Sequence, residues 1–390
     1  MAPISAGKWE GVIMSGASVV LLEFDPELNA FGKDKSLRDG LSVALQIGDT
    51  LWVANDETIS LERLSLVAGG NTGPYSYARH HKQFSLNDYL RLPVPHRDGA
   101  DVEEVDVEGL DYKEGYLWLV GSHSLKRKTP KLQDGAKKAQ VQMAQVSGDG
   151  NRYLLARIPV VERDGTYTLT KKETRNGKER TAAQLHGNNQ SNDLAKALRE
   201  DEHLGSFIGI PGKDNGFDIE GLAVASDRLF IGLRGPVLRG WAVILEVELK
   251  EDNDQPSTLK LKAIGPNDRR YRKHFLHLGG LGIRDLCIQG SDLLILAGPT
   301  MDLDGPVTIF RWPKGTDPKG ESVVPAIELE RVLDVPYGQG VDHAEGMTLF
   351  SPEGGAARSL LVVYDSASKN RQSGRSTVAA DVFRLPPTSE

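Results

Sequence analysis

The chain has 390 residues, of which 39% are hydrophobic and 26% are charged, a balance typical of a globular protein and unlike that of a disordered one. Its formal net charge of −7 disfavours a nucleic-acid partner, because binding phosphates requires a basic surface. A single cysteine, Cys287, excludes an internal disulfide, and no apolar run approaches the roughly 20 residues of a membrane-spanning helix. The segment Met1–Gly11 lacks the apolar core of a signal peptide, so we expect a cytoplasmic protein.

Taken in chain order, the predicted elements repeat one pattern, in which a short apolar run, a turn and a second apolar run follow one another. In the first four copies a leucine opens the second run nine positions after the first residue of the copy. Two such runs around a turn rich in glycine, aspartate or serine predict a β-hairpin. The five copies begin at Ser42, Glu108, Glu220, Arg284 and Glu345.

Further strand-like runs follow the hairpins, and two polar stretches interrupt the pattern. These insertions lie at about residues 125–140, where the chain is strongly basic, and at about 178–205. In the second insertion a helix is expected from Asp193 to Arg199 or beyond. Neither insertion resembles a separate domain, so we predict a single domain over residues 1–390. The other expected strands are 153–161, 166–171, 241–249, 259–264, 307–312 and 378–385.

Four strands repeated around a ring make a β-propeller, an architecture that leaves only short, protected sheet edges. We therefore expect an all-β protein consisting of one propeller with five four-stranded blades. A sixth, degenerate blade would fit if the 112-residue interval between Glu108 and Glu220 holds more than one blade. The last repeat has too few residues after Leu385 for a fourth strand, so the N-terminal segment around Trp9 to Leu22 is expected to supply it and close the ring.

The first residues of the repeats are expected to meet at one mouth of the central channel. In a propeller the first strand of each blade lines the channel and the second strand runs antiparallel to it, so the start of one and the end of the other share a face. This places Glu108, Glu220, Glu345 and Arg284 around the mouth. His343 stands two residues before Glu345 and can point the same way. The residues expected to ring the mouth from the second strands include Asp56, His123, Arg234 and Asp365.

Three neighbouring carboxylates cannot all stay ionised without compensation. A divalent metal such as calcium, magnesium or manganese would supply it, because hard cations take carboxylate oxygens as ligands. Arginine side chains could instead hold the carboxylate or phosphate of a ligand. A purely structural interpretation is equally open, in which each glutamate accepts backbone hydrogen bonds within its blade. The run Asp302–Gly305 resembles the start of a calcium loop but lacks its later ligands, and is interpreted as a turn.

Four pairs of motifs carry a resemblance to a known family. They are Val107–Leu110 with Val120–Ser124, Asp218–Leu222 with Gly232–Pro236, Ile283–Leu286 with Ala297–Pro299, and His343–Gly346 with Val362–Asp365. Together they resemble an uncharacterised bacterial family known only as a domain of unknown function. The resemblance covers nearly the whole chain and implies a bacterial propeller, cytoplasmic or associated with the envelope, without an activity to carry over.

More loosely, the repeated Glu-Gly-Leu runs are similar to phytase-like esterase propellers and to metal-dependent lactonase propellers such as gluconolactonase and paraoxonase. In the lactonases an acidic residue near a blade start coordinates the metal, and this resemblance gives that role to Glu108, Glu220 or Glu345. The sequence departs from the lactonase pattern at Ser42 and Arg284, where an acidic or amide residue would be expected.

Two functions fit these residues. In the first, the chain is a metal-dependent hydrolase of small anionic esters: the three glutamates hold the metal, which activates water, and His123 or His343 is the general acid or base. The ligand contacts expected in this site are Arg234, Arg284, Asp56 and Asp365.

In the second, the propeller is a non-catalytic scaffold that binds a ligand or a protein partner, and its carboxylates and arginines form an internal ion-pair network. The basic segment from Lys126 to Lys138 would then contact the partner. An open cavity faced by the carboxylates would favour the enzyme. An Arg284 side chain locked against the glutamates with no cavity left would favour the scaffold.

Overall fold

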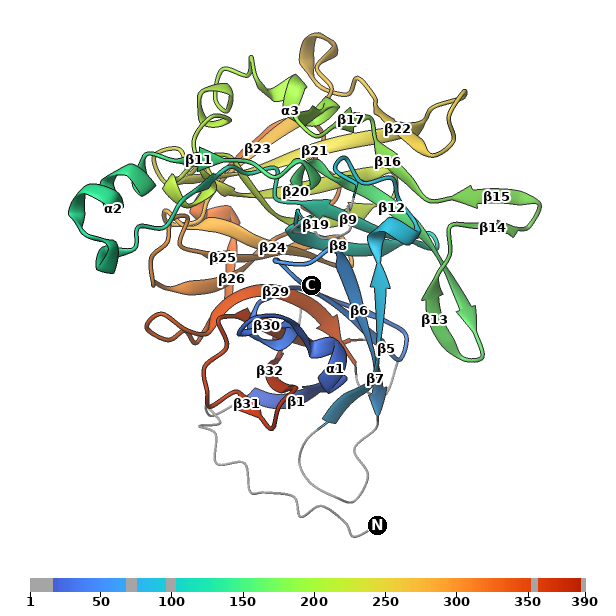
Figure 1. Cartoon of the computed structure of the whole chain (residues 1–390). Helices are drawn as coiled ribbons and strands as arrows, with labels where there is room; N and C mark the ends of the chain where they lie inside the picture. The colour runs from blue at the N-terminus through green and yellow to red at the C-terminus, as the bar shows by residue number, and fades with distance from the viewer. Residues whose placement is uncertain (1–16, 68–75, 96–102, 352–356, 387–390) are drawn as a thin grey trace.

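Each sequence repeat folds as an antiparallel hairpin whose strands are largely buried. The computed structural model describes residues 17–67, 76–95, 103–351 and 357–386, and its long strands form curled, propeller-like sheets (Figure 1). The hairpins are β4 (Leu41–Ile47) with β5 (Thr50–Asn55), β8 (Val107–Lys113) with β9 (Tyr116–Gly121), β19 (Asp218–Ala225) with β20 (Arg228–Gly235), β24 (Gly282–Gln289) with β25 (Asp292–Gly298), and β29 (His343–Phe350) with β30 (Ser359–Asp365).

Outer strands extend every hairpin by antiparallel pairing. They are β6 (Ser60–Val67), β7 (Ser76–Ser85), β12 (Leu155–Arg163), β16 (Ala183–Leu185), β21 (Trp241–Glu251), β23 (Arg272–His277), β26 (Val307–Trp312), β28 (Glu330–Val335) and β32 (Thr377–Arg384). Short parallel contacts then join the outer edges of successive sheets, since β22 (Thr258–Leu261) pairs with β16 and β27 (Ser322–Val324) pairs with β23.

The remaining elements are short and lie in connections. The strands are β2 (Ala30–Gly32), β3 (Lys35–Ser36), β10 (Lys126–Arg127), β11 (Val146–Ser147), β13 (Thr166–Leu169), β14 (Lys172–Arg175), β15 (Lys178–Thr181), β17 (Gly187–Asn188), β18 (Ser191–Asn192) and β31 (Gln372–Ser373). The helices are α1 (Pro26–Asn29), α2 (Ala136–Met143) and α3 (Asp193–Leu198), with 3₁₀ turns at 37–39, 86–88, 132–134, 150–153, 205–207, 212–214, 266–268 and 326–328. None of the described helices has the length and apolar character needed to cross a membrane.

The five innermost strands contact one another in sequence: β4 packs on β8, β8 on β19, β19 on β24, β24 on β29, and β29 on β4. The glycine of each Glu-Gly pair allows this close approach. A Cβ added at Gly109 would lie 2.6 Å from the Leu222 Cβ, and one added at Gly346 would lie 2.6 Å from the Val43 Cα. The glycines of the repeat are therefore packing residues, placed where one inner strand meets the next.

The N-terminal strand β1 (Ala17–Glu23) pairs antiparallel with β32, from Ala17 opposite Phe383 to Glu23 opposite Thr377. The sequence predicted this pairing for a segment around Trp9 to Leu22, of which Trp9–Gly16 lies outside the described residues. Strand β1 also runs parallel to β7 over three residues, so it connects the last sheet of the chain to the first.

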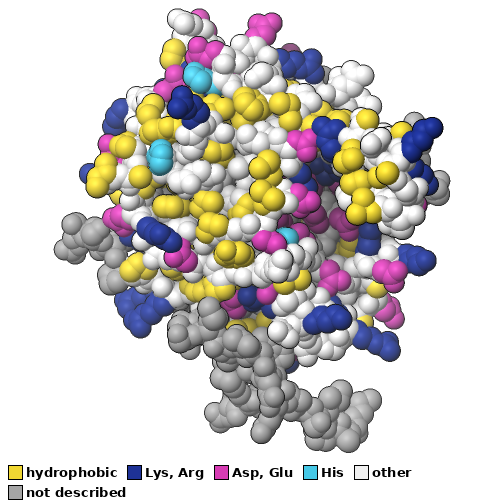
Figure 2. Space-filling model, turned by 90° about the vertical axis from the view of Figure 1, so that its left-hand side faces the viewer, with side chains coloured by type: hydrophobic (Ala, Val, Ile, Leu, Met, Phe, Trp, Pro, Cys, Tyr) yellow, Lys and Arg dark blue, Asp and Glu magenta, His cyan; other side chains and the backbone are white. Residues whose placement is uncertain are grey.

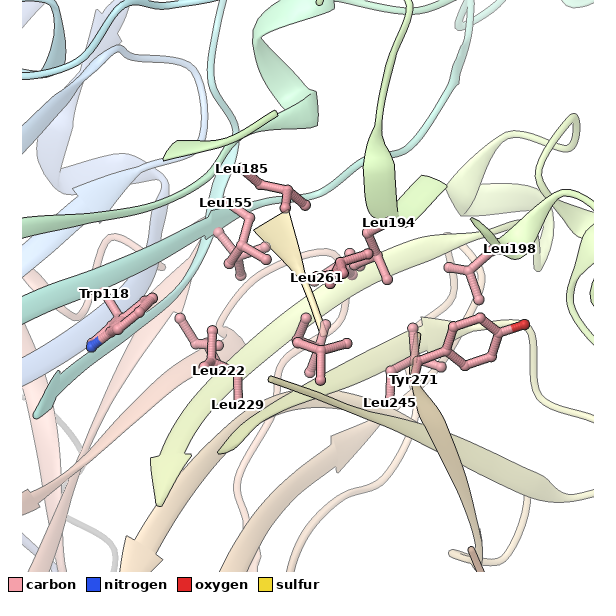
Figure 3. Packing of buried hydrophobic residues seen from close by; sticks show 14 of the residues in the cluster. Trp118, Leu155, Leu185, Leu194, Leu198, Leu222, Leu229, Leu245, Leu261 and Tyr271 are labelled. Atoms are coloured by element: carbon pink, nitrogen blue, oxygen red, sulfur yellow. The ribbon is translucent and has the colours of Figure 1, made fainter. Parts of the chain in front are cut away.

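The two predicted insertions project from the sheets, and α2 stands away from the body of the molecule (Figure 1). The helix expected at Asp193–Arg199 is present as α3. Its N-cap is Asn192, whose side chain accepts a hydrogen bond from the Ala195 amide. The buried leucines Leu194 and Leu198 hold α3 against the largest apolar cluster, which also contains Trp118 and Tyr271 (Figure 3).

Candidate functional site

A cavity of about 580 Å³ lies where the starts of the first strands and the ends of the second strands come together. Figure 2 shows a hollow on the molecular surface in which acidic and basic side chains gather. Of the nine residues that the sequence proposed for the site, eight line the cavity: Asp56, Glu108, Glu220, Arg234, Arg284, His343, Glu345 and Asp365.

A β-bulge at the same position of every first strand accompanies this convergence. In each hairpin the pairing register skips the residue that begins the repeat, and in β19 it also skips the following glycine. The shifts fall between Leu41 and Val43, Val107 and Gly109, Ile219 and Leu222, Ile283 and Asp285, and Ala344 and Gly346. A bulge bends its strand and redirects the side chain of the extra residue. The constant spacing of the repeat therefore places equivalent side chains at equivalent points around the cavity.

Two arginines of the site are engaged with its carboxylates. The Arg284 Nε lies 3.1 Å from the Glu220 Oε2, and the Arg284 Nη2 donates to the Glu345 carboxylate. The Arg234 Nη1 donates to the Glu220 Oε1 at 2.7 Å, and its Nε donates to the Thr300 carbonyl at 3.0 Å. Charge-assisted contacts of this kind hold both guanidinium groups in place. Arg284 thus bridges carboxylates from the inner strands on either side of its own.

A third buried arginine, which the sequence interpretation missed, also pairs with carboxylates of the cavity. Arg152 donates to the Glu104 carboxylate, lies 2.9 Å from the Asp106 Oδ2, and donates to the Ser124 hydroxyl at 2.7 Å. All four residues line the cavity. Asp106 could have been found, because it stands two positions before Glu108, as His343 stands two positions before its glutamate. Arg152 comes from a 3₁₀ turn outside the repeat and carries no such signal.

Asp56 and Glu108 differ from the other carboxylates of the cavity. Within the described part of the chain, neither side chain has a hydrogen-bond or ion-pair partner, although Glu108 is only 8% exposed. Burial raises the pKa of both carboxyl groups well above the usual range, and the nearby charge of Asp106 raises both further. These two groups are therefore easily protonated or readily paired with a cation.

His343 sits at the edge of the cavity between two carboxylates. Its Nε2 lies 3.1 Å from the Asp304 Oδ1, and its Nδ1 lies 4.0 Å from the Asp365 Oδ2. The interaction with Asp365 is the main cause that raises the pKa of His343, and Asp304 adds to it against the opposing effect of burial. Burial acts to raise the pKa of Asp365, but the contact with His343 and a backbone hydrogen bond from Ser366 lower it. The imidazole is thus oriented from both sides and remains partly open to the cavity.

The sequence predicts only that Asp304 belongs to a turn. It does belong to a loop, but this loop lines the cavity, and the Asp304 carboxylate also accepts a hydrogen bond from the Gly340 amide at 3.0 Å. The sequence contains no repeat or spacing that would have linked Asp304 to His343.

His123, the remaining predicted residue, does not line the cavity. Its side chain is buried. The His123 Nδ1 lies 2.8 Å from the Gly121 carbonyl oxygen, and the His123 Nε2 lies 2.6 Å from the side-chain nitrogen Nδ2 of Asn192. Burial lowers the pKa of His123 to about 4, so the ring is neutral at physiological pH. Because Asn192 is also the N-cap of α3, His123 ties the second insertion to the end of β9. This position supports a structural role rather than the catalytic one predicted.

The predicted metal ligands Glu108, Glu220 and Glu345 all line the cavity, but two of them already share Arg284. Over the described ranges of the chain, no three histidine, cysteine or carboxylate side chains are grouped so that they could hold a metal ion. Burial raises the pKa of Glu345 to about 8 despite the opposing effect of Arg284. The metal set therefore stays a prediction that the observed donor geometry does not favour.

Solved structures similar to this chain include the glutaminyl cyclase of Myxococcus xanthus, with a TM-score of 0.36 and 10% identity over 96% of this chain and 100% of that one. Apo AztD of Citrobacter koseri is similar with a TM-score of 0.26 and 10% identity over 86% of this chain and 70% of that one. No curated protein matches. The family described as "Protein of unknown function (DUF3616)" matches residues 40–381, most of the length, and the chain therefore belongs to the DUF3616 family.

Proposed function

We propose that this chain is a single-domain, five-bladed β-propeller with a hydrolase site in the cavity at one mouth of its channel. The cyclic contacts of the five innermost strands support this blade count. The pairing of β1 with β32 supports closure of the ring by the N-terminal strand. The segments at about 125–140 and 178–205 are then insertions in one domain, and the interval between Glu108 and Glu220 holds one blade.

The observation that carries the catalytic proposal is the placement of His343 between Asp304 and Asp365 at the edge of the cavity. A histidine held in one orientation by carboxylates is suited to general acid–base catalysis. In neutral His343 the Nε2–H donates to Asp304, and Nδ1, which is 4.0 Å from the Asp365 Oδ2, removes a proton from a water molecule whose oxygen adds to the carbonyl carbon of an ester. The imidazolium then returns this proton to the departing alkoxide, which leaves as the alcohol. The residues needed for both transfers are on this chain.

The more detailed prediction from the sequence is a metal-dependent hydrolase of small anionic esters, with calcium, magnesium or manganese as the metal. The geometry of the cavity gives less support to an anionic substrate. An anion bound by Arg234 or Arg284 would have to compete with the carboxylates that these guanidinium groups already contact. A metal would likewise have to displace Arg284 from Glu220 or Glu345. We therefore prefer hydrolysis by His343 without a step through a metal ion.

A non-catalytic binding scaffold is the second candidate, and one specific observation favours it. Arg284 joins β24 to Glu220 on β19 and to Glu345 on β29, as expected of an internal ion-pair network. The basic segment gives this reading less support, because Lys126 lies 2.5 Å from both Glu104 and Asp149 and is therefore paired within the chain. The open cavity distinguishes the two candidates in favour of the enzyme.

The test is hydrolysis of p-nitrophenyl acetate, p-nitrophenyl phosphate and γ-butyrolactone by the purified chain and two variants. His343→Gln should lower kcat at least about 100-fold, the usual contribution of a general base. His186→Gln is the matched control, because His186 also lies 3.1 Å from a carboxylate, that of Asp193, but outside the cavity. Equal rates for the two variants would overturn the catalytic role. A chain that hydrolyses none of the three compounds would favour the scaffold.

A further inference from the structure

The charge of the cavity is strongly unbalanced. Its lining contains eleven aspartate and glutamate side chains but only six lysines and arginines. The three buried arginines are all in ion pairs. Of the exposed lining cations, Arg127 lies 2.6 Å from Asp214 and Lys126 contacts two other carboxylates. Lys213 is the lining cation that has no ion-pair partner among the described residues. Eleven carboxyl groups against six cations leave an excess of five acidic groups, whose ionised forms give the cavity a negative field. Such a field attracts cations and repels anions.

Glu108 is a carboxylate of the cavity that has no positively charged side chain beside it. In the order in which the inner strands contact one another, Arg284 stands between Glu220 and Glu345 and pairs with both. The neighbours of Glu108 in this order are Ser42 and Glu220, so no cation reaches it from either side. Its carboxyl group is more than nine-tenths buried, lines the cavity and has no partner among the described residues. A buried, unpaired carboxylate is unfavourable unless a positive charge is brought to it.

Part of the cavity lining is apolar. This part consists of Pro299, Val307 and the exposed side chains of Met301, Leu303 and Tyr337. Leu303 is 61% exposed and Tyr337 48% exposed, so both can cover the carbon body of a ligand. A volume of about 580 Å³ falls within the range of small-molecule sites and far exceeds what one metal ion needs.

We propose that this cavity binds a small organic cation, an alkyl ammonium or guanidinium compound, whose charged end pairs with Glu108 and Asp56 and whose carbon chain lies against Met301, Leu303 and Tyr337. The inference rests on the proposed function in that it names the ligand class of the same site. Binding can nevertheless be measured without turnover, so the two proposals can fail separately.

Proton linkage gives the binding a distinctive signature. Burial and neighbouring charges raise the pKa of both Asp56 and Glu108, so the empty site retains protons that free carboxyl groups would lose. A bound cation favours the ionised forms and releases those protons. Affinity should therefore increase as the pH rises, and the number of protons released should decrease in Glu108→Gln.

The experiment is isothermal titration calorimetry of the full chain with agmatine, which carries an ammonium and a guanidinium group, in two buffers of different ionisation enthalpy. We expect saturable binding with proton release, and at least a tenfold weaker affinity in Glu108→Gln and in Asp56→Asn. Glu179→Gln is the control, since Glu179 is an exposed carboxylate on β15 outside the cavity. Thermal unfolding of the unliganded variants checks folding. Glu108→Gln should unfold no earlier than the parent chain, because it removes an unpaired buried acid.

Three results would overturn the proposal. The first is no binding of agmatine at 10 mM in low salt, and the second is equal affinity for agmatine in Glu108→Gln and Glu179→Gln. The third is that the chain binds calcium or inorganic phosphate in a Glu108-dependent way but does not bind agmatine. Calcium binding alone would restore the metal site, and phosphate binding alone would restore the anionic substrate. Loss of hydrolysis in His343→Gln without any agmatine binding would leave the hydrolase and remove only the cation.

Discussion

Replacing Gly109 by alanine tests whether the repeated glycines hold the inner strands together. A Cβ at this position would lie 2.6 Å from the Leu222 Cβ and 2.8 Å from the Leu222 backbone nitrogen, where ordinary contacts are 3.4–4 Å. Since the nitrogen belongs to the backbone of β19, no side-chain rotation can relieve the overlap. Strands β8 and β19 would have to separate by roughly 0.8 Å in a tightly packed region.

The magnitude follows from the cost of overpacking, which is about 1–3 kcal/mol for an added methyl group that cannot be accommodated. We expect Gly109→Ala to lower the free energy of unfolding by this amount in urea denaturation monitored by tryptophan fluorescence. The matched control is Gly320→Ala, because a Cβ at Gly320 meets nothing within 4 Å and should change stability by less than about 0.5 kcal/mol. If the two variants are equally stable, the glycine of the repeat is not needed for strand approach and the packing argument is wrong.

Three further predictions can be checked with simple measurements. Burial raises the pKa of Glu345 to about 8 and that of Asp218 to about 7. At these two groups the folded chain therefore binds more protons than the unfolded chain between about pH 4 and pH 8. The melting temperature should fall as the pH rises through this window. Asp304→Asn removes one carboxylate that raises the pKa of His343, so the acid limb of the kcat/KM profile should move to lower pH; an unchanged limb would exclude His343 as the base. Asn192→Ala removes the N-cap of α3 and its link to the end of β9. It should lower the free energy of unfolding by about 1 kcal/mol and speed limited proteolysis within residues 187–205. Equal proteolysis rates in the variant and the parent chain would contradict this anchoring role.

The repeat was readable from the sequence because its spacing is set by geometry. A hairpin with a short turn fixes which residues pair, so the nine-residue interval places the bulge at the same point in four of the five first strands. The residues at these bulges, including Glu108 and Arg284, were therefore found by position alone. Strand β1 could be inferred for a similar reason, since the final repeat lacked residues for its own outer strand.

The ion pairs of the site could not be read from the sequence. Asp304 and Arg152 come from loops whose course depends on tertiary packing, and no repeat marks them. His123 follows β9 as predicted, but its backbone is left-handed, with φ of 57°, and its ring meets α3 instead of the cavity. Strand position thus predicted which residues reach one end of the sheets. It did not predict the direction of side chains that lie just beyond a strand end.

The cyclic order of the inner strands suggests how to remove the charge imbalance at Glu108. Ser42 occupies the position in β4 that Arg284 occupies in β24, and its strand contacts β8. An arginine there would extend toward Glu108 as Arg284 extends toward Glu345. Ser42→Arg should therefore lower the pKa of Glu108 and abolish agmatine binding, at the cost of the hydrogen bond from the Ser42 hydroxyl to the Val107 carbonyl.

Ser42→Gln is the control for this variant, because it loses the same hydroxyl and adds a long side chain without charge. Calorimetry with agmatine should show weaker binding in Ser42→Arg than in Ser42→Gln, with less proton release. Circular dichroism of both variants verifies that the strands form. If Ser42→Arg binds agmatine as tightly as Ser42→Gln, then Glu108 does not receive the cation. The imbalance produced by the order of residues around the cavity would then have no part in ligand recognition.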